Sequence, residues 1–315
     1  MENISQKIKI ISLFVIILVI LWVIPNVHKY ESILNITTVL EGNSKPVIIL
    51  AFGDLMLDRG ARFYMNKYGS DYPLKNIHEL LKNNDIVLAN LEGPITSNPS
   101  KTINKNNAPL QFTFSTTTAL LLKNEGITML GLANNHTLNF GNAGLKETKK
   151  YLMENGLDYF GDPSNTGEIS IIKEINGMKI GFVGYHEFSY KNYDKIISEI
   201  IRLRSIADFL IVSAHWGIEY NKNYTKDQQK KAHQFIDAGA DLVIGAHPHV
   251  VEPVEIYKNK HIFYSLGNFI FDQDFSYDTT HGLAVRITIP AKNIGETKYD
   301  LIPLSIIKSQ VSITN

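Results

Sequence analysis

Two histidines separated by one proline, His247-Pro248-His249, directly follow the apolar run 242–246 (LVIGA). An extended H-x-H segment places both imidazoles on one side of a strand, because side chains alternate with a period of two. Pro248 favours an extended conformation for the pair. Since neutral imidazole is the commonest metal ligand, the pair indicates a metal site. The alternative is two packed or solvated histidines at the end of a strand.

Other potential ligands follow four further apolar runs. Asp54 comes after 47–52 (VIILAF), Glu92 after 86–90 (IVLAN), Asn135 and His136 after 127–133 (ITMLGLA), and His215 after 209–214 (FLIVSA). The carboxyl ends of the strands in an α/β sheet point at the binding crevice. Turn chemistry explains any one of these residues. Five strand ends that each carry a candidate ligand favour a common site.

The types of these residues limit the chemistry. Carboxylate, amide oxygen and imidazole ligands without a thiolate suit Mn, Fe or Zn better than a calcium cage. The six candidate ligands exceed the needs of one tetrahedral ion: Asp54, Glu92, Asn135, His215, His247 and His249. Two metal ions that share a bridging carboxylate would use all six and would activate a water. His136 is not needed as a ligand and is therefore the natural proton donor to a leaving group.

Helical patterns alternate with these strands and predict a mixed α/β fold. They cover residues 74–83, 116–125, 143–155, 196–206 and 226–238. After Val250 the pattern changes to shorter β runs at 253–257, 261–265, 283–289 and 299–307, and Asn176-Gly177 is typical of a hairpin turn. We therefore expect two packed mixed sheets flanked by helices.

The N-terminus predicts a membrane anchor. The run from Ile10 to Ile24 is apolar except for Ser12 and follows two lysines. It is shorter than a span of roughly 20 residues, but no small-residue cleavage site follows it. We expect a cytoplasmic tip and a single-pass signal anchor at 1–29, a linker at 30–45, and a body at 46–315 that faces the outside of the cell.

Composition and missing motifs exclude several classes of protein. Lys+Arg and Asp+Glu both number 31, so the net charge is zero and no broad basic surface for nucleic acid is expected. The chain has no cysteine, which excludes disulfides, thiolate metal sites and a cysteine nucleophile. It also lacks a Walker loop, a dinucleotide-binding glycine motif, H-E-x-x-H and G-x-S-x-G.

The series GDLML, NLEGPIT, LANNHTLNFG, SAHWGIEY, GADLVIGAHPHV and YSLGNFIFDQ, within residues 47–272, resembles the bacterial capsule-synthesis CapA family. That family is associated with poly-γ-glutamate synthesis and is similar in fold to calcineurin-like metallophosphoesterases, which have a double β-sandwich flanked by helices. The resemblance implies that Asp54 binds the first metal ion and that Glu92 bridges the two ions. It implies that Asn135 binds the second ion and that His136 is the acid. Three histidines would complete the two ligand shells: His215, His247 and His249.

Three positions depart from the phosphoesterase and family patterns. The D-x-H of typical phosphoesterases reads Asp54-Leu55-Met56, the bridging aspartate is Glu92, and Asn139 stands where family members often have an acidic residue. This ligand set fits either one metal ion or two ions of which the second is held weakly. Glu219, four residues after His215, fits a position against substrate or in the core equally well.

Three functions fit these residues. The first is a membrane-anchored, externally facing protein of capsule or poly-γ-glutamate biosynthesis or export, whose metal site hydrolyses or handles the anionic polymer. The second is a surface metallophosphoesterase that acts on a phosphorylated substrate. The third is a non-catalytic scaffold that binds polymer or capsule synthase subunits. The imidazole missing at Met56 favours the first and third.

Overall fold

The computed structural model describes residues 45–102, 110–189 and 192–314. The chain divides between Lys45 and Pro46, and the body described here is Pro46–Asn315. The predicted anchor, and the linker up to residue 44, lie outside the described residues. Within the described ranges, no helix combines the length and the apolar character that a membrane span requires.

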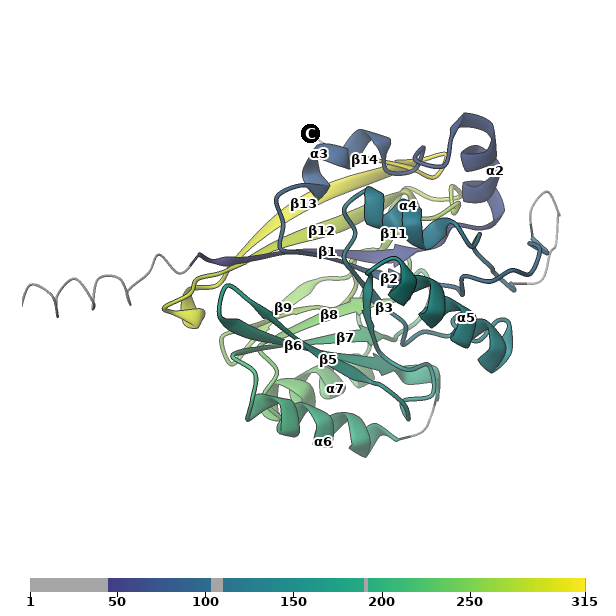
Figure 1. Ribbon diagram of the computed structural model, residues 1–315. Helices are drawn as coiled ribbons and strands as arrows, with labels where there is room; N and C mark the ends of the chain where they lie inside the picture. Colours follow the sequence, from purple (N-terminus) through teal and green to yellow (C-terminus); the bar gives the residue numbers. More distant parts are fainter. Residues whose placement is uncertain (1–44, 103–109, 190–191, 315) are drawn as a thin grey trace, which may run out of the picture. The chain divides into compact units, whose positions relative to one another are not determined.

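The first sheet joins parallel and antiparallel strands in the order β14-β13-β12-β1-β2-β3-β4, with β11 beside β1 (Figure 1). Strands β1 to β4 and β11 run parallel, whereas β12, β13 and β14 form an antiparallel extension. The bounds are β1 (Val47–Leu55), β2 (Ile86–Leu91), β3 (Met129–Gly131), β4 (Asp158–Phe160), β11 (Asn268–Ile270), β12 (His281–Ile289), β13 (Lys298–Ile307) and β14 (Gln310–Ile313).

The second sheet has the order β5-β6-β7-β8-β10-β9. Its central strands are parallel, and the edge strands β5 and β9 are antiparallel to their neighbours. The predicted hairpin at Asn176-Gly177 is confirmed, because Ile175 pairs with Met178 across it. The bounds are β5 (Ser170–Ile175), β6 (Met178–His186), β7 (Phe209–His215), β8 (Leu242–Ala246), β9 (Val254–Tyr257) and β10 (Lys260–Phe263).

Helices cover the outer faces of both sheets. The first sheet carries α2 (Arg59–Tyr68), η1 (Lys75–Ile77), α3 (His78–Leu81), α4 (Thr118–Asn124) and α5 (Gly141–Glu154), and the second carries α6 (Tyr193–Arg204) and α7 (Lys226–Asp237). Short 3-10 turns occur at η2 (Glu187–Ser189), η3 (Asp278–Thr280) and η4 (Ile294–Glu296). Helix α6, for example, buries an apolar stripe of Ile196, Ile200 and Leu203.

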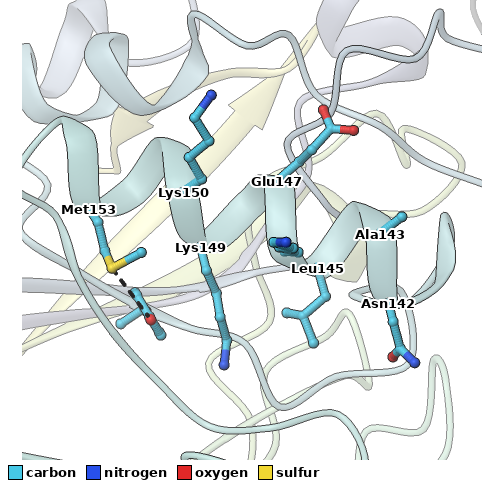
Figure 2. A pocket seen from close by; sticks show the side chains of 9 residues that line it. Asn142, Ala143, Leu145, Glu147, Lys149, Lys150 and Met153 are labelled. Carbon is cyan, nitrogen blue, oxygen red and sulfur yellow. Dashed lines mark hydrogen bonds between the residues drawn. The ribbon is translucent and has the colours of Figure 1, made fainter.

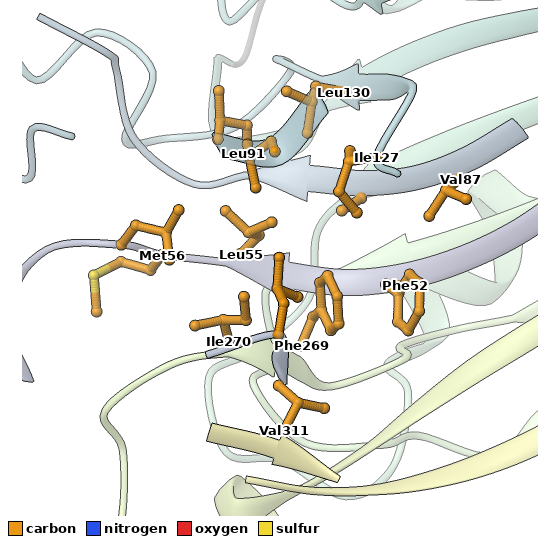
Figure 3. Close-up of a cluster of buried hydrophobic side chains, with 14 of the residues drawn as sticks. Phe52, Leu55, Met56, Val87, Leu91, Ile127, Leu130, Phe269, Ile270 and Val311 are labelled. Atoms are coloured by element: carbon orange, nitrogen blue, oxygen red, sulfur yellow. The ribbon is translucent and has the colours of Figure 1, made fainter. Parts of the chain in front are cut away.

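Alternation along the strands builds three apolar layers. On β1, Ile49 and Ala51 face the second sheet, and Leu50 and Phe52 face the helices on the other side. Figure 3 shows part of this outer layer, where Phe52 stacks on Phe269 with ring centroids 3.9 Å apart. A third layer lies between the second sheet and α6 and α7. The predicted pair of packed mixed sheets with flanking helices is therefore confirmed.

The same alternation directs polar residues into the space between the sheets. On β2, Ile86 and Leu88 face inward, so Asn90 and then Glu92 follow on the same side. On β7, Ile211 faces inward, and so does His215. Because the parallel strands of both sheets end at one edge, these residues meet at the mouth of the inter-sheet space.

The predicted extended conformation of the H-x-H segment is wrong. Strand β8 ends at Ala246, and the backbone then turns, with φ of 99° at His247 and 59° at His249. Non-glycine residues adopt positive φ only where the surrounding structure holds them. Here the N–H of His247 donates to Asp54 Oδ2 (2.9 Å), and the N–H of Tyr220 donates to the carbonyl oxygen of Pro248 (2.8 Å).

Candidate metal centre

Asp54 is brought into the centre by an irregularity at the end of β1. The pairing of β1 with β2 shifts register between Ala51 and Asp54. A Cβ atom at Gly53 would lie 1.9 Å from the carbonyl oxygen of Gly267, so only glycine allows this approach. Asp54 is fully buried, which would raise the pKa of its carboxyl group. Hydrogen bonds from His249, the His247 backbone and Asn90 outweigh burial and lower that pKa.

Glu92 is the most unusual residue of the cluster. Its side chain is buried, and neither carboxylate oxygen has a hydrogen-bond partner in the described part of the chain. The nearest imidazole nitrogens to Oε1 are Nε2 of His249 at 3.6 Å and Nε2 of His136 at 3.9 Å. Burial, and then the charge of Asp54, raise the pKa of Glu92 well above its usual value. A buried carboxylate without a partner is costly unless a cation compensates it.

His249 has the tautomer that a metal ligand needs. Its Nδ1 lies 3.0 Å from Asn268 Oδ1 and 3.3 Å from Asp54 Oδ2, so this nitrogen carries the proton. The orientation of Asn268 is fixed, because its Nδ2 donates to Gln273 Oε1 and to the carbonyl oxygen of Thr279. The lone pair of His249 Nε2 therefore lies on the side of Glu92. Such a fixed tautomer is typical of metal-binding histidines.

His215 and His247 form a second, directly connected pair. His215 Nε2 lies 3.2 Å from His247 Nδ1 and 2.8 Å from Asn135 Oδ1. Burial and the neighbouring His247 lower the pKa of His215 well below its usual value. Burial and His249 lower the pKa of His247 to about 3, so both rings are neutral and able to bind metal. Asn135 is exposed and reaches the cluster through its bond to His215.

His136 lies at the edge of the cluster with one ring nitrogen held. Its Nδ1–H donates to Asn139 Oδ1 (3.1 Å), which also accepts the backbone N–H of Phe112 (2.7 Å). Burial lowers the pKa of His136, and the bond to Asn139 opposes that shift. Asn139 thus orients the imidazole as a carboxylate would, without adding a negative charge. Nε2 of His136 remains for proton transfer on the side of Glu92.

Sequence reasoning missed Asn90 and left Glu219 undecided. Asn90 Nδ2 donates to Asp54 Oδ1 (2.7 Å) and lies 3.3 Å from His215 Nδ1, so it joins the two sheets. Its position two residues before Glu92, on the same face of β2, was the available signal. Glu219 lies beside His247 and His249 although it is far from them in sequence.

Two groups of side chains in the described ranges have the spacing of a metal site. One is Asp54 with Glu92 and His249, and the other is Glu219 with His247 and His249. In each group the potential ligand atoms all lie within 4.8 Å of one another. The unpartnered oxygens of Glu92 and the free lone pair of His249 fit a divalent cation that accepts oxygen and nitrogen ligands.

A cavity of about 410 Å³ borders the centre on the side of β6. His186 and Phe188 line it, and the ring of Phe188 lies against that of His247 with centroids 4.4 Å apart. A larger hollow of about 680 Å³ lies along α5, where Lys149, Lys150 and Met153 form part of its wall (Figure 2). None of the candidate ligands lines either cavity.

Comparison with known proteins identifies the family. Residues 48–273 match the model of a family described as bacterial capsule synthesis protein PGA_cap. The chain belongs to the PGA_cap family. The resemblance predicted from the sequence motifs is therefore confirmed.

Two PGA_cap relatives are similar over most of the chain. Capsule biosynthesis protein CapA of Bacillus anthracis is 31% identical over 274 residues, which are 81% of this chain and 66% of that protein. PGA biosynthesis protein CapA of Bacillus subtilis (strain 168) is 28% identical over 271 residues, 81% of this chain and 70% of that protein. The chain thus spans about two thirds of the length of these relatives.

Solved structures are similar only at a low level. TT1561 of Thermus thermophilus has a TM-score of 0.47 and 10% identity, and covers 81% of this chain and 99% of its own. Purple acid phosphatase PPD1 of yellow lupin has a TM-score of 0.41 and 12% identity, and covers 86% of this chain and 53% of its own.

Proposed function

We propose that this PGA_cap protein is a membrane-anchored, externally facing component of capsule or poly-γ-glutamate biosynthesis that hydrolyses its anionic polymer with a metal centre. Family membership and the CapA relatives support the place in capsule synthesis. The two packed sheets with a polar cluster at their strand ends support a calcineurin-like metallophosphoesterase fold. The apolar run at 10–24 supports the anchor and the outside location of the body.

The observation that carries the metal-dependent part is the buried carboxylate of Glu92. Among the described residues neither of its oxygens has a partner, and it lies beside the carboxylate of Asp54. Two neighbouring buried carboxylates repel each other, so both are charged only when a cation lies between them. The predicted ligands Asp54, Glu92 and His249, with His215, His247 and Asn135 on the other side, would hold one or two ions of Mn, Fe or Zn.

A divalent ion bound there would supply Lewis-acid chemistry, which polarises a carbonyl or phosphoryl oxygen and makes water a better nucleophile at neutral pH. Side chains of the protein would transfer the proton and position the ligands. Asn139 keeps the Nδ1 proton of His136 in place, so Nε2 is the atom that exchanges a proton with the leaving group. Asn90 joins Asp54 to His215 and keeps the ligands of the two sheets at fixed spacing.

The function is tested with the full chain in detergent, poly-γ-glutamate as substrate and Mn²⁺ as the metal. The proposal predicts new chain ends with the wild type, and no new ends after chelation. His136→Asn is expected to retain metal and lose about 10²- to 10⁴-fold in rate, as for removal of a general acid. Asp54→Ala is expected to lose metal as well.

Two other outcomes would replace this proposal. Hydrolysis of an aryl phosphate with Mn²⁺, and none of the polymer, would identify a surface phosphoesterase. Polymer binding without hydrolysis, together with normal capsule in cells that carry His136→Asn, would identify a scaffold for polymer or synthase subunits. The anchor is tested separately, by sequencing the N-terminus of membrane-bound protein. A mature terminus near residue 30 would contradict it.

A further inference from the structure

We infer that Glu219 is a metal ligand that, together with His247, holds a second divalent cation at the solvent side of the centre. This inference rests on the proposed metal-dependent function and adds a ligand to it. The deeper cation would be held by Asp54, Glu92 and His249.

The loop after β7 places Glu219 beside the turn formed by the H-x-H segment, His247-Pro248-His249, which is called the H-P-H turn below. The N–H of Gly217 donates to Glu187 Oε2 (2.7 Å), which fixes the start of the loop. At its end, the N–H of Tyr220 donates to the carbonyl oxygen of Pro248 (2.8 Å), and Tyr220 has a φ of 63°. Since Pro248 separates the two histidines, this bond fixes the backbone next to Glu219 against them.

The distances suit coordination after a small side-chain movement. One ligand atom from each of Glu219, His247 and His249 lies within 4.8 Å of the other two. Metal–ligand bonds of about 2.0–2.2 Å allow two ligand atoms on one ion to be up to about 4.4 Å apart. Because the Glu219 side chain is exposed, it can rotate by the remaining few tenths of an ångström without disturbing the core.

The two groups share His249, which has one free lone pair and can serve only one ion at a time. Its Nε2 is directed toward Glu92, so His249 belongs to the deeper position. The outer ion then keeps Glu219 and His247 from this group, next to His215 and Asn135. Because Glu219 is exposed, the outer position binds its ion more weakly than the deeper one.

Charge also favours a second ion. Three carboxylates meet here, from Asp54, Glu92 and Glu219, and an imidazole that binds a metal ion is neutral. One divalent ion leaves a net charge of −1, from +2 and −3, and two ions leave +1, from +4 and −3. An anionic polymer is repelled by the first state and attracted by the second. The outer ion would therefore recognise the carboxylate groups of the substrate.

Met56 stands where the D-x-H pattern has its imidazole, and it supplies no ligand to the deeper ion. Met56, at that position, is fully buried, and its sulfur accepts the backbone N–H of Asp58 (3.1 Å). The sulfur is thus engaged inside the core. The deeper ion therefore gains no ligand here, and Glu219 adds its ligand to the outer ion.

The test is a Mn²⁺ titration of the full chain in detergent after chelation, with bound metal measured by elemental analysis. The wild type is expected to bind two ions with different affinities. Glu219→Gln is expected to lose the weaker ion. Its affinity for that ion should fall by at least about 10- to 100-fold, which is the typical cost of removing a residue that only supports a metal ligand. Glu174→Gln, an exposed glutamate on β5, is the matched control and should bind two.

The outcomes separate this inference from the proposed function. A wild-type chain that binds no Mn²⁺ defeats both. Glu219 is not a metal ligand if Glu219→Gln binds two ions with unchanged affinities, or if the wild type binds only one ion. Either result leaves the deeper site in place. Thermal midpoints of the variants in chelator should equal that of the wild type, since Glu219 and Glu174 are exposed.

Discussion

Replacing Glu92 with glutamine should have opposite effects on stability with and without metal. Without a cation, the wild type buries the Glu92 carboxylate beside Asp54, and its two oxygens have no partner in the part of the chain that the structure describes. An unsatisfied buried polar group costs about 1–3 kcal/mol, and a charged one costs more. Glu92→Gln removes the charge and keeps the shape. In chelator at pH 8 the variant should therefore be more stable than the wild type by at least about 1 kcal/mol.

With metal the order should reverse. A ligand at about 100 times its Kd stabilises the folded state by about 2.7 kcal/mol, and 1 kcal/mol corresponds to about 2–4 °C in a domain of 150–250 residues. The wild type should thus gain about 5–10 °C in Tm with saturating Mn²⁺. Glu92→Gln lacks the ligand charge and should gain almost nothing.

Differential scanning fluorimetry of the full chain in detergent, with chelator and with Mn²⁺, measures both effects. Glu252→Gln is the control, because Glu252 is also buried but lies outside both ligand groups, so this variant should keep the metal-induced shift. A Glu92→Gln variant that is less stable than the wild type in chelator would refute the account of Glu92. An equal Mn²⁺ shift in both proteins would refute it as well.

Three further predictions concern the surroundings of the centre. Burial raises the pKa of Glu252 to about 7, so the wild type loses stability as the pH rises from about 4.5 to 7. In chelator, Glu252→Gln should therefore match the wild type in stability at pH 4 and exceed it by about 3 kcal/mol at pH 8. A Cβ at Gly245 would lie 1.8 Å from a main-chain oxygen, so Gly245→Ala should cost about 1–3 kcal/mol or more, whereas Gly131→Ala, with contacts no closer than 3.8 Å, should cost less. Asn139→Ala should bind as much metal as the wild type but cleave polymer more slowly, because it loses part of the rate enhancement of about 10²- to 10⁴-fold that His136 contributes. An unchanged rate of cleavage would show that Asn139 does not position His136.

The strands and most helices could be predicted from the sequence because they follow local periodicity. Strand β8 was predicted at its observed bounds, and the predicted strands on β1, β2 and β7 differ from the observed ones by three residues or fewer. Helix α2 was missed because it is polar on average and buries only the small side chain of Ala61, so no run of large apolar residues marks it. Strands β4 and β11, of three residues each, are too short to show a period of two.

The centre was only partly predictable, because its details depend on contacts between distant segments. Residue types and strand ends pointed to the cluster, and the structure brings Asp54, Glu92 and the three predicted histidine ligands together there. The positive φ of His247 depends on a hydrogen bond to Asp54, 193 residues away, which no local rule contains. Glu219 likewise reaches the centre only through the bond between its loop and the H-P-H turn.

The buried cluster of Asp54, Glu92 and the histidines is either a divalent-metal centre or polar packing, and the metal content of the full chain decides between them. Protein produced with Mn²⁺, purified in detergent and dialysed exhaustively should retain at least one divalent ion per chain. Chelation should remove it. Asp54→Ala, which removes a carboxylate from the deeper group, should retain none, and Glu174→Gln should retain as much as the wild type. A metal-free wild type, or equal metal in Asp54→Ala, would contradict the assignment of a metal centre.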